Sequence, residues 1–250
     1  MIAAIIQARM NSKRLFGKVL KKILYKPVIY YQIERLKRSK QIDKIIIATT
    51  KNKLDDQLEI FCKKYNLICF RGDENNVLKR YYDCAKYHRV KHIIRLTGDC
   101  PLTEIKLLEK MIKIHITNKY EYTSNNIEPF WPDGFDIEII NFSTLSKLNN
   151  IVNLNSDKEH VTTYIKNNLN KFKYKSLKPN KNYSNFRLTL DQYEDFLLIS
   201  KIFEKLYRKK KYFDFNDIQI LFKNDPNMLL LNKNIIRNQG LKISLKNEKK

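Results

Sequence analysis

The segment Arg9–Lys18 carries, within ten residues, several side chains that can bind phosphate groups. The groups concerned belong to Arg9, Ser12, Arg14, Gly17 and Lys18. Cationic side chains, a hydroxyl and backbone N–H groups together neutralise phosphate oxygens, so this combination suits a triphosphate. A surface loop that is basic only because the whole chain is rich in lysine is the alternative interpretation.

Two aspartates follow apolar segments of strand type elsewhere in the chain. Asp99 comes after His92–Leu96, and Asp191 comes after Phe186–Leu190. Magnesium in proteins prefers one or two carboxylates together with substrate phosphates. A carboxylate that faces a cationic loop is therefore a natural magnesium ligand, although Gly98-Asp99 shortly before a proline is also typical of an ordinary turn.

Strand-like and helix-like segments alternate over the first half of the chain. β-Branched apolar runs predict strands at Ala3–Ala8, Lys44–Thr49, Leu67–Phe70 and His92–Leu96. Apolar residues at helical spacing predict helices at Val28–Arg38, Leu54–Lys64, Val77–His88 and Glu104–Thr117. This alternation indicates a mostly parallel sheet with helices on both faces. In such sheets ligands bind beyond the carboxyl ends of the strands, where Arg9–Lys18 and Asp99 would meet.

The alternation loosens after about residue 119. Further strands are expected at Tyr120–Thr123, Phe135–Ile140, Phe172–Leu177 and Phe186–Leu190. Further helices are expected at Lys158–Asn168, Phe196–Tyr207 and Phe215–Phe222, the first of them capped by Ser156 or Asp157. Glu194 and Asp195 fall where acidic residues stabilise a helix N-terminus. No repeat or long linker divides the chain, which favours a single domain.

The net charge of +23 fits anionic small substrates as well as nucleic acid. Only 11 of the 49 cationic residues are arginine, the residue best suited to bidentate phosphate and base contacts. The lysines are spread along the chain, so specific nucleic-acid binding is not expected.

The cysteines and the apolar segments bear on location. The four cysteines are scattered without a C-x-x-C pair, which indicates reduced thiols. No apolar stretch approaches the roughly 20 residues that cross a bilayer, and the first apolar run stops at Gln7, so a soluble, cytoplasmic protein is expected.

Seven segments in fixed order together resemble a known family. They are Arg9-Met10-x-Ser12-x-Arg14-Leu15-x-Gly17-Lys18, Ala48-Thr49-Thr50, Arg71-Gly72, Val77-Leu78-x-Arg80-Tyr81, Gly98-Asp99-Cys100-Pro101-Leu102, Glu159-His160-Val161-Thr162 and Arg187-Leu188-Thr189-Leu190-Asp191-x-x-Glu194-Asp195-Phe196. This set is similar to the cytidylyltransferases of the spore-coat-polysaccharide type, relatives of CMP-KDO synthetases and acylneuraminate cytidylyltransferases. The resemblance spans roughly residues 2–232. Asn11 and Phe16 depart from the glycine and proline usual in the family, and neither change removes a phosphate ligand.

The resemblance implies a Rossmann-like, glycosyltransferase-A-like α/β fold with a mixed, mostly parallel sheet. It implies transfer of CMP from CTP to an acidic sugar or related acceptor, with release of pyrophosphate, in surface polysaccharide or glycan biosynthesis. Mg²⁺ as cofactor and a homodimer follow from the same resemblance. The single nucleotidyltransferase domain of residues 1–250 would then comprise a nucleotide-binding half (1–118), an acceptor-binding and possibly dimerising half (119–232) and a basic tail (233–250).

The family's site residues carry over to matching positions. The nucleotide would contact Arg9, Ser12, Arg14, Lys18, Arg71, Arg80 and Asp99. Among these, Arg9, Lys18 and Asp99 would be catalytic, and Asp99 and Asp191 would bind the metal. The acceptor pocket is expected to involve Asn125, Asp133, Asp136, Glu138, Glu159, His160 and Arg187, with Arg187 able to bind an acceptor carboxylate bidentately.

Other enzyme classes remain as alternatives. A different nucleotidyltransferase of the same fold would be separated by its nucleotide selectivity. A nucleotide-sugar-dependent glycosyltransferase usually carries an Asp-x-Asp metal motif, and Asp133-Gly134-Phe135-Asp136 does not supply that spacing. A basic nucleic-acid-binding module is the remote alternative, and it would lose affinity steeply as salt rises.

Overall fold

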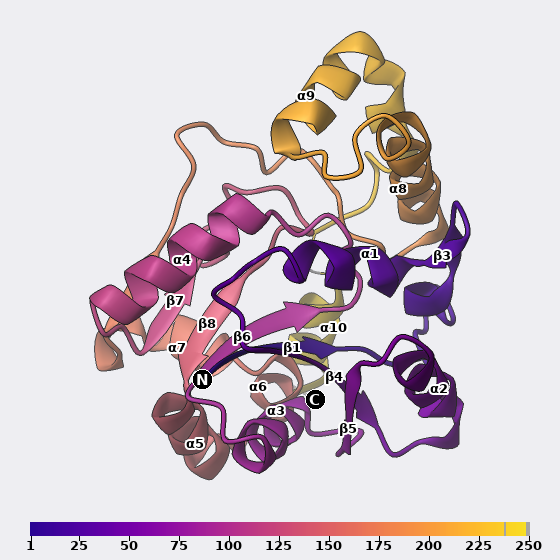
Figure 1. The fold of residues 1–250 in the computed structure, drawn as a ribbon. Helices are drawn as coiled ribbons and strands as arrows, with labels where there is room; N and C mark the ends of the chain where they lie inside the picture. The colour runs from indigo at the N-terminus through magenta and orange to yellow at the C-terminus, as the bar shows by residue number, and fades with distance from the viewer. Residues whose placement is uncertain (238, 249–250) are drawn as a thin grey trace.

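A computed structural model describes residues 1–237 and 239–248 of the chain (Figure 1). Its centre is a seven-stranded sheet in the order β5-β4-β1-β6-β8-β7-β9. The strands are β1 (Ile2–Gln7), β4 (Lys44–Thr50), β5 (Ile68–Gly72), β6 (His92–Thr97), β7 (Tyr122–Ser124), β8 (Glu138–Asn141) and β9 (Tyr174–Ser176). Only β8 runs antiparallel to its two neighbours, so the sheet is mixed and mostly parallel, as predicted. A separate hairpin pairs β2 (Lys22–Ile23) with β3 (Lys26–Pro27).

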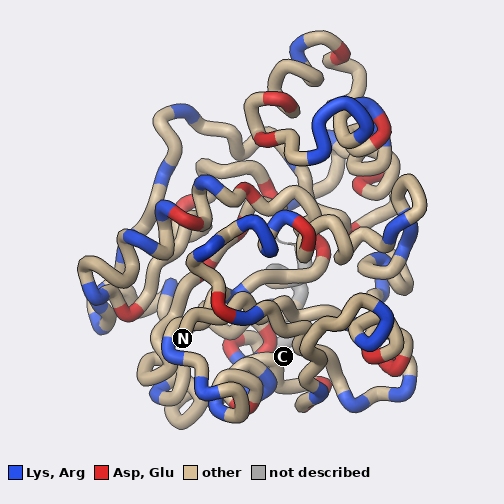
Figure 2. Tube along the Cα trace, in the orientation of Figure 1, with Lys and Arg blue, Asp and Glu red and all other residues tan. Residues whose placement is uncertain are grey.

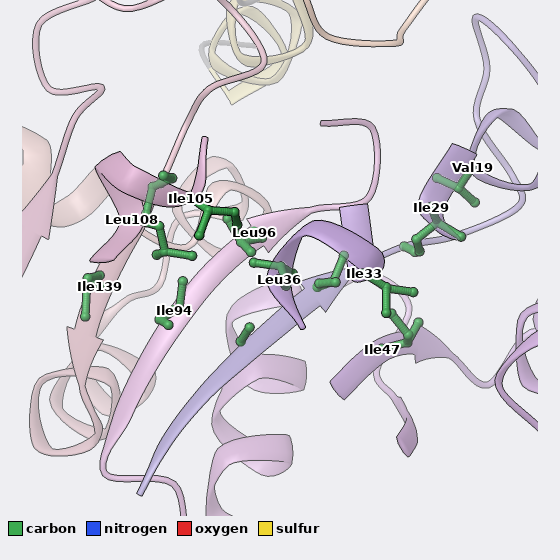
Figure 3. Close-up of a cluster of buried hydrophobic side chains, with 14 of the residues drawn as sticks. Val19, Ile29, Ile33, Leu36, Ile47, Ile94, Leu96, Ile105, Leu108 and Ile139 are labelled. Carbon is green, nitrogen blue, oxygen red and sulfur yellow. The ribbon is translucent and has the colours of Figure 1, made fainter. Parts of the chain in front are cut away.

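One face of the sheet is covered by α1 (Val28–Leu36), α2 (Asp56–Lys64) and α4 (Ile105–Thr117). Their apolar sides pack on strand residues such as Ile47 and Ile94, both fully buried (Figure 3). Burying one such side chain stabilises a fold by about 1.5–3 kcal/mol. This packing fixes the parallel strands and therefore the positions of the loops that leave their carboxyl ends.

The opposite face is covered by α3 (Val77–Tyr87), α5 (Phe142–Ile151), α6 (Asn155–His160) and α7 (Thr163–Asn167). A C-terminal helix, α10 (Gln239–Glu248), packs against α6. Lysine and arginine are scattered over helices on both sides of the sheet (Figure 2). No helix within 1–237 or 239–248 has the length and apolar character needed to cross a membrane.

A third layer lies beside α1 and the hairpin. It contains α8 (Tyr193–Leu206), α9 (Phe215–Asn224) and the 3₁₀ segment Pro226–Leu231, which stand apart from the sheet in Figure 1. Its core is rich in aromatic rings, including fully buried Phe203 and Phe213. Shorter 3₁₀ turns occur at Lys18–Leu20, Lys53–Asp55 and Leu169–Lys171.

The predicted elements of the first half agree with the structure to within a few residues. Two predictions for the second half are wrong. Phe186–Leu190 is extended but forms only one isolated bridge, between Asp133 and Arg187, because its backbone bonds to loops instead of a strand. The basic tail expected at 233–250 stays a prediction; within it the chain forms helix α10 over Gln239–Glu248, and Asn238, Lys249 and Lys250 lie outside the described residues.

The second wrong prediction is a continuous helix over Lys158–Asn168 capped by Ser156 or Asp157. The chain instead forms α6 and α7, separated at the buried residue Val161. Val161 has φ 61° and ψ −52°, and the N–H of Thr162 bonds to the carbonyl of His160 at 2.6 Å. This is a γ-turn with a β-branched residue at its centre, a strained conformation that apolar spacing does not reveal.

Candidate active site

The loop that follows β1 is held by its own backbone. The carbonyl of Met10 accepts bonds from the N–H of Ser12 (2.8 Å) and of Gly17 (2.9 Å), closing the loop on itself. Gly17 has φ 63°, which favours glycine, and the Met10 side chain would lie 3.1 Å from any added Cβ. The N–H of Met10 donates to buried Asp55 at 2.7 Å, which anchors the start of the loop. The segment expected to bind triphosphate is therefore preorganised.

Lys18 from this loop lies between two carboxylates. Its Nζ is 2.6 Å from Oδ2 of Asp99, beyond β6, and 2.9 Å from Oδ1 of Asp191, just before α8. Arg14 approaches the other oxygen of Asp191 at 2.7 Å. Burial alone lowers the pKa of Lys18, but the two carboxylates outweigh it and raise that pKa above its ordinary value. Burial likewise opposes ionisation of Asp99, and the charge of Lys18 nevertheless keeps the Asp99 pKa below its ordinary value.

The donor set at this point fits magnesium. Asp99 and Asp191 are close enough for one ammonium group to contact both, and their oxygens are the hard ligands that Mg²⁺ prefers. Within the described ranges, no cluster of three or more His, Cys, Asp or Glu residues could hold a metal alone. A site with two carboxylates leaves coordination positions for phosphate oxygens, which is the usual arrangement for magnesium with a nucleotide.

Asp195 organises the segment that carries Asp191. It is fully buried and accepts bonds from Nε and Nη2 of Arg187, each at 2.9 Å, and from Asn232 at 2.8 Å. It also accepts the backbone N–H groups of Asp191 (3.0 Å) and Gln192 (2.9 Å), the second bond being part of a capping box at the start of α8. Asp195 therefore does more than favour the helix terminus, because it fixes the backbone of a candidate metal ligand.

All three nitrogens of the Arg187 guanidinium have carboxylate partners. Its Nη1 lies 2.6 Å from Oδ2 of Asp133, while the other two nitrogens bind Asp195. The fork expected to bind an acceptor carboxylate bidentately is therefore already filled, which revises the role expected for Arg187. Burial and then the charge of Asp136 raise the pKa of Asp133 to about 6.

These residues line a cavity of about 390 Å³ beyond the carboxyl ends of the strands. Seven residues singled out in the sequence line it: Arg14, Asp99, Asp133, Asp136, His160, Arg187 and Asp191. The cavity also contains cations that the sequence analysis did not assign, namely Arg95, Lys166 and Arg237. Arg95 stands four residues before Asp99, where strand periodicity could have indicated it, whereas no sequence signal marks Lys166 or Arg237.

Some residues expected at the nucleotide lie outside this cavity. Arg71 binds Asp56 (2.6 Å) and Glu59 (2.9 Å) beside β5. Arg80 is buried and donates to the carbonyl of Asp73 at 2.9 Å; burial and the nearby charge of Arg9 lower its pKa. The loop residues Arg9, Ser12 and Lys18 are likewise not among the cavity-lining residues, although Lys18 contacts two of them.

Three residues expected at the acceptor have structural partners. Asn125 is buried, and its amide bonds to the carbonyl of Phe135 and the N–H of Ile137, each at 2.8 Å. Glu138 is buried under the cavity wall beside Arg95 and Lys166. Glu159 is partly exposed and accepts a bond from Ser244 of α10 at 2.7 Å. His160 does line the cavity, and burial lowers its pKa.

A mostly parallel α/β sheet with a cationic loop and two aspartates at its carboxyl edge suits an enzyme that binds the phosphates of a nucleotide there. Comparisons with known proteins give the particular family. The family model for cytidylyltransferases matches residues 3–239, so the chain belongs to the cytidylyltransferase family, whose reaction is CMP transfer from CTP. The predicted family and fold class are both confirmed.

Individual relatives are similar to most of the chain or to part of it. The spore coat polysaccharide biosynthesis protein SpsF of Bacillus subtilis is 34% identical over 211 residues, 82% of this chain and 87% of that protein. A 3-deoxy-manno-octulosonate cytidylyltransferase of Pelobacter propionicus is 30% identical over 112 residues, 45% of this chain and 43% of that protein. The structure of a cytidylyltransferase from Leptospira borgpetersenii matches with a TM-score of 0.88 at 33% identity, covering 94% of this chain and 98% of that one.

Proposed function

We propose that the protein transfers CMP from CTP to a hydroxyl of an acidic sugar, in a reaction that depends on Mg²⁺. The observation that carries the proposal is Lys18, held between Asp99 and Asp191 at the edge of a cavity lined by further cations. Family membership supports the nucleotide, and the lining of the cavity supports an anionic acceptor.

The site residues would have different roles in the reaction, depending on where they lie. Nucleotidyl transfer is an in-line attack by the acceptor oxygen on the α-phosphorus, to which a protein contributes chiefly positioning and electrostatic stabilisation. Mg²⁺ bound by Asp99 and Asp191 would neutralise phosphate charge and lower the pKa of the attacking hydroxyl. Arg14 and Lys18 would stabilise the charge that grows on departing pyrophosphate, together with Arg9 from the same loop.

The acidic nature of the acceptor rests on the charge of the cavity and on the relatives. Five cationic side chains line the cavity: Arg14, Arg95, Lys166, Arg187 and Arg237. Four aspartates line it as well, but the charges of two of these, Asp99 and Asp191, would be balanced by the bound metal. The relative from Pelobacter propionicus is named for 3-deoxy-manno-octulosonate, a sugar acid. Together these observations favour a carboxylated acceptor over a neutral one.

A thermal-shift comparison tests the nucleotide without knowledge of the acceptor. CTP, UTP, ATP and GTP are each added with and without MgCl₂. A ligand at about 100 times its dissociation constant stabilises by about 2.7 kcal/mol, or roughly 5–10 °C for a chain of this size. A shift selective for CTP and dependent on Mg²⁺ supports the proposal. Equal small shifts with all four nucleotides would contradict it and indicate anion binding by a surface of charge +23.

Three further expectations extend this proposal. Participation in surface polysaccharide or glycan biosynthesis is supported by the similarity to SpsF. Formation of a homodimer stays a prediction, for which the exposed apolar side chains of Ile151 and Leu154, at and beyond the end of α5, are candidate contacts. A cytoplasmic location also stays a prediction.

A further inference from the structure

Two cations on one wall of the cavity share a single buried carboxylate. Arg95 on β6 and Lys166 on α7 both bind Glu138 of β8, Lys166 at 3.0 Å. Glu138 is 1% exposed and also accepts hydrogen bonds from the hydroxyls of Tyr122 and Thr162. Arg95 and Lys166, with side chains 12% and 29% exposed, both line the cavity, whereas Glu138 does not.

The charges on this wall do not balance. Burial opposes ionisation of Glu138, but the charges of Lys166 and Arg95 outweigh it and hold the Glu138 pKa far below its ordinary value. Glu138 therefore carries one negative charge against two positive ones. His160, the neighbouring titratable group in the wall, has a pKa lowered by burial and adds no charge at neutral pH. One positive charge is left facing the cavity, where keeping it from bulk water is costly without an anionic partner.

Both cations retain donors for such a partner. A lysine ammonium has three N–H groups, and Lys166 uses one of them on Glu138. A guanidinium has five, and Arg95 bonds to Glu138 through Nη1 and to Gln7 through Nη2 at 3.2 Å. This leaves N–H groups on both terminal nitrogens of Arg95. Arg187, by contrast, bonds through all three of its nitrogens to the carboxylates of Asp133 and Asp195, so its positive charge is already compensated.

The strained turn at Val161 shapes the same wall. By separating α6 from α7, it brings His160, Thr162, Thr163 and Lys166 to the cavity, all of which line it. A γ-turn at a buried β-branched residue costs free energy, and such strain is retained chiefly where it positions functional groups.

We infer that Arg95 and Lys166 form the subsite that binds the carboxylate of the acceptor. The inference rests on the proposed function and names the part of the cavity that makes the acceptor acidic. A carboxylate carries one negative charge, which matches the single uncompensated positive charge of this wall. A phosphate monoester carries nearly two charges at neutral pH and would leave one of them unmatched.

The test compares Lys166→Gln with the wild-type chain, and Lys175→Gln on exposed β9 serves as the matched control. The probe is 3-deoxy-manno-octulosonate, with its carboxamide as the neutral analogue and glucose 1-phosphate as the phosphorylated one. Each is titrated calorimetrically into protein saturated with Mg²⁺ and a CTP analogue whose methylene bridge prevents turnover. Glu138 keeps Arg95, Tyr122 and Thr162 as partners in Lys166→Gln, so this variant should fold.

The subsite predicts that Lys166→Gln weakens binding of the sugar acid roughly tenfold or more, the value of one lost charge-assisted hydrogen bond. The wild type should bind the carboxamide equally weakly, and Lys175→Gln should match the wild type. Arg95→Lys, which keeps a charge beside Glu138, should also lose affinity for the acid. Equal binding of the acid by wild type and Lys166→Gln would overturn the inference. It would also be overturned if the wild type bound the carboxamide or the phosphate as tightly as the acid, or did not bind the acid at all.

The CTP analogue separates this inference from the proposed function. All variants should bind it as the wild type does, because Lys166 and Arg95 are placed at the acceptor. Failure of the wild type to prefer the CTP analogue over the UTP analogue would contradict the proposed function itself. Selective binding of the CTP analogue, with no effect of Lys166→Gln on the sugar acid, would contradict only the subsite.

Discussion

The ammonium nitrogen of Lys18 lies 2.6 Å from a carboxylate oxygen of Asp99, although 81 positions separate the two residues in sequence. The contact joins the loop after β1 to the loop after β6, two strands that are neighbours in the sheet. The same nitrogen also contacts Asp191, so one lysine bridges both candidate metal ligands. Lys18 therefore occupies the position that a cation between these carboxylates would take, and a metal must compete with it.

This competition predicts the behaviour of Lys18→Met. Removing the ammonium takes away the cationic partner of Asp99 and leaves Asp191 with Arg14, so the variant should bind Mn²⁺ without nucleotide roughly tenfold or more tightly than the wild type. Titration followed by the electron paramagnetic resonance of free Mn²⁺ measures this directly. Lys13→Met, at an exposed position of the same loop, is the matched control and should behave as wild type. Equal Mn²⁺ affinity in Lys18→Met and wild type would show that the lysine does not compete with a metal ion for the two carboxylates.

Asp99→Asn should lower kcat by a factor of about 100 to 1,000 or more, the scale seen when one preorganised electrostatic group is lost from an active site. The variant should stay folded, because Lys18 keeps Asp191 as its partner. Pyrophosphate release with CTP and an acceptor gives the rate, and thermal melting reports the fold. Asp83→Asn, on the outer side of α3 with Lys79, is the control and should retain full turnover. Turnover of Asp99→Asn near that of wild type would exclude Asp99 as a metal ligand.

The first half of the fold could be predicted because local pattern and tertiary structure agree there. Buried parallel strands such as Lys44–Thr50 are continuous apolar β-branched runs, and the helices between them present one apolar side. The carboxyl edge of the sheet then brings Lys18 and Asp99 together by topology alone. Sequence reasoning could therefore place the basic loop after β1 beside Asp99.

The second half follows rules that periodicity does not capture. The γ-turn at Val161 is imposed by the tertiary packing of a buried residue, against the preference of valine. The partners of Arg187 come from two distant segments, so its occupied guanidinium was invisible from the sequence. Lys166 and Arg237 reach the cavity only because α7 and the segment before α10 pack beside it.

Asp195 should be a major determinant of stability. It is fully buried and accepts bonds from Arg187, Asn232 and two backbone N–H groups. Asp195→Ala therefore breaks a buried Arg–Asp ion pair, although Arg187 keeps Asp133 as a second partner. Breaking such a pair costs about 3–5 kcal/mol. Urea unfolding at pH 7 measures the loss of unfolding free energy. Glu194→Ala, at the exposed neighbouring position, should change it by about 0.5 kcal/mol or less. A similar small loss in both variants would show that Asp195 acts only at the helix terminus.

His115 should make the fold sensitive to acid. The ring is fully buried between Thr123 (2.9 Å) and Asn141 (2.8 Å), and burial lowers its pKa to about 4. In the unfolded chain the pKa of this histidine is about 6.5, so below that pH the unfolded state binds a proton at His115 that the folded state does not bind. Titration of His115 therefore costs no unfolding free energy above about pH 6.5. The unfolding free energy falls progressively as the pH drops toward 4, and the loss is about 2 kcal/mol at pH 5.

Urea unfolding at pH 7 and pH 5 isolates this contribution of His115. The drop in unfolding free energy between the two values should be smaller by about 2 kcal/mol in His115→Gln than in the wild type, since glutamine has no proton to gain. His88, which is half-buried and whose pKa burial also lowers, provides the comparison. Because it is less buried than His115, His88→Gln should keep most of the wild-type drop. An unchanged drop in His115→Gln would mean that the buried ring accepts its proton without loss of the fold. The acid sensitivity would then come from other groups, such as Asp99 and Glu138, whose pKa values are lowered in the folded state.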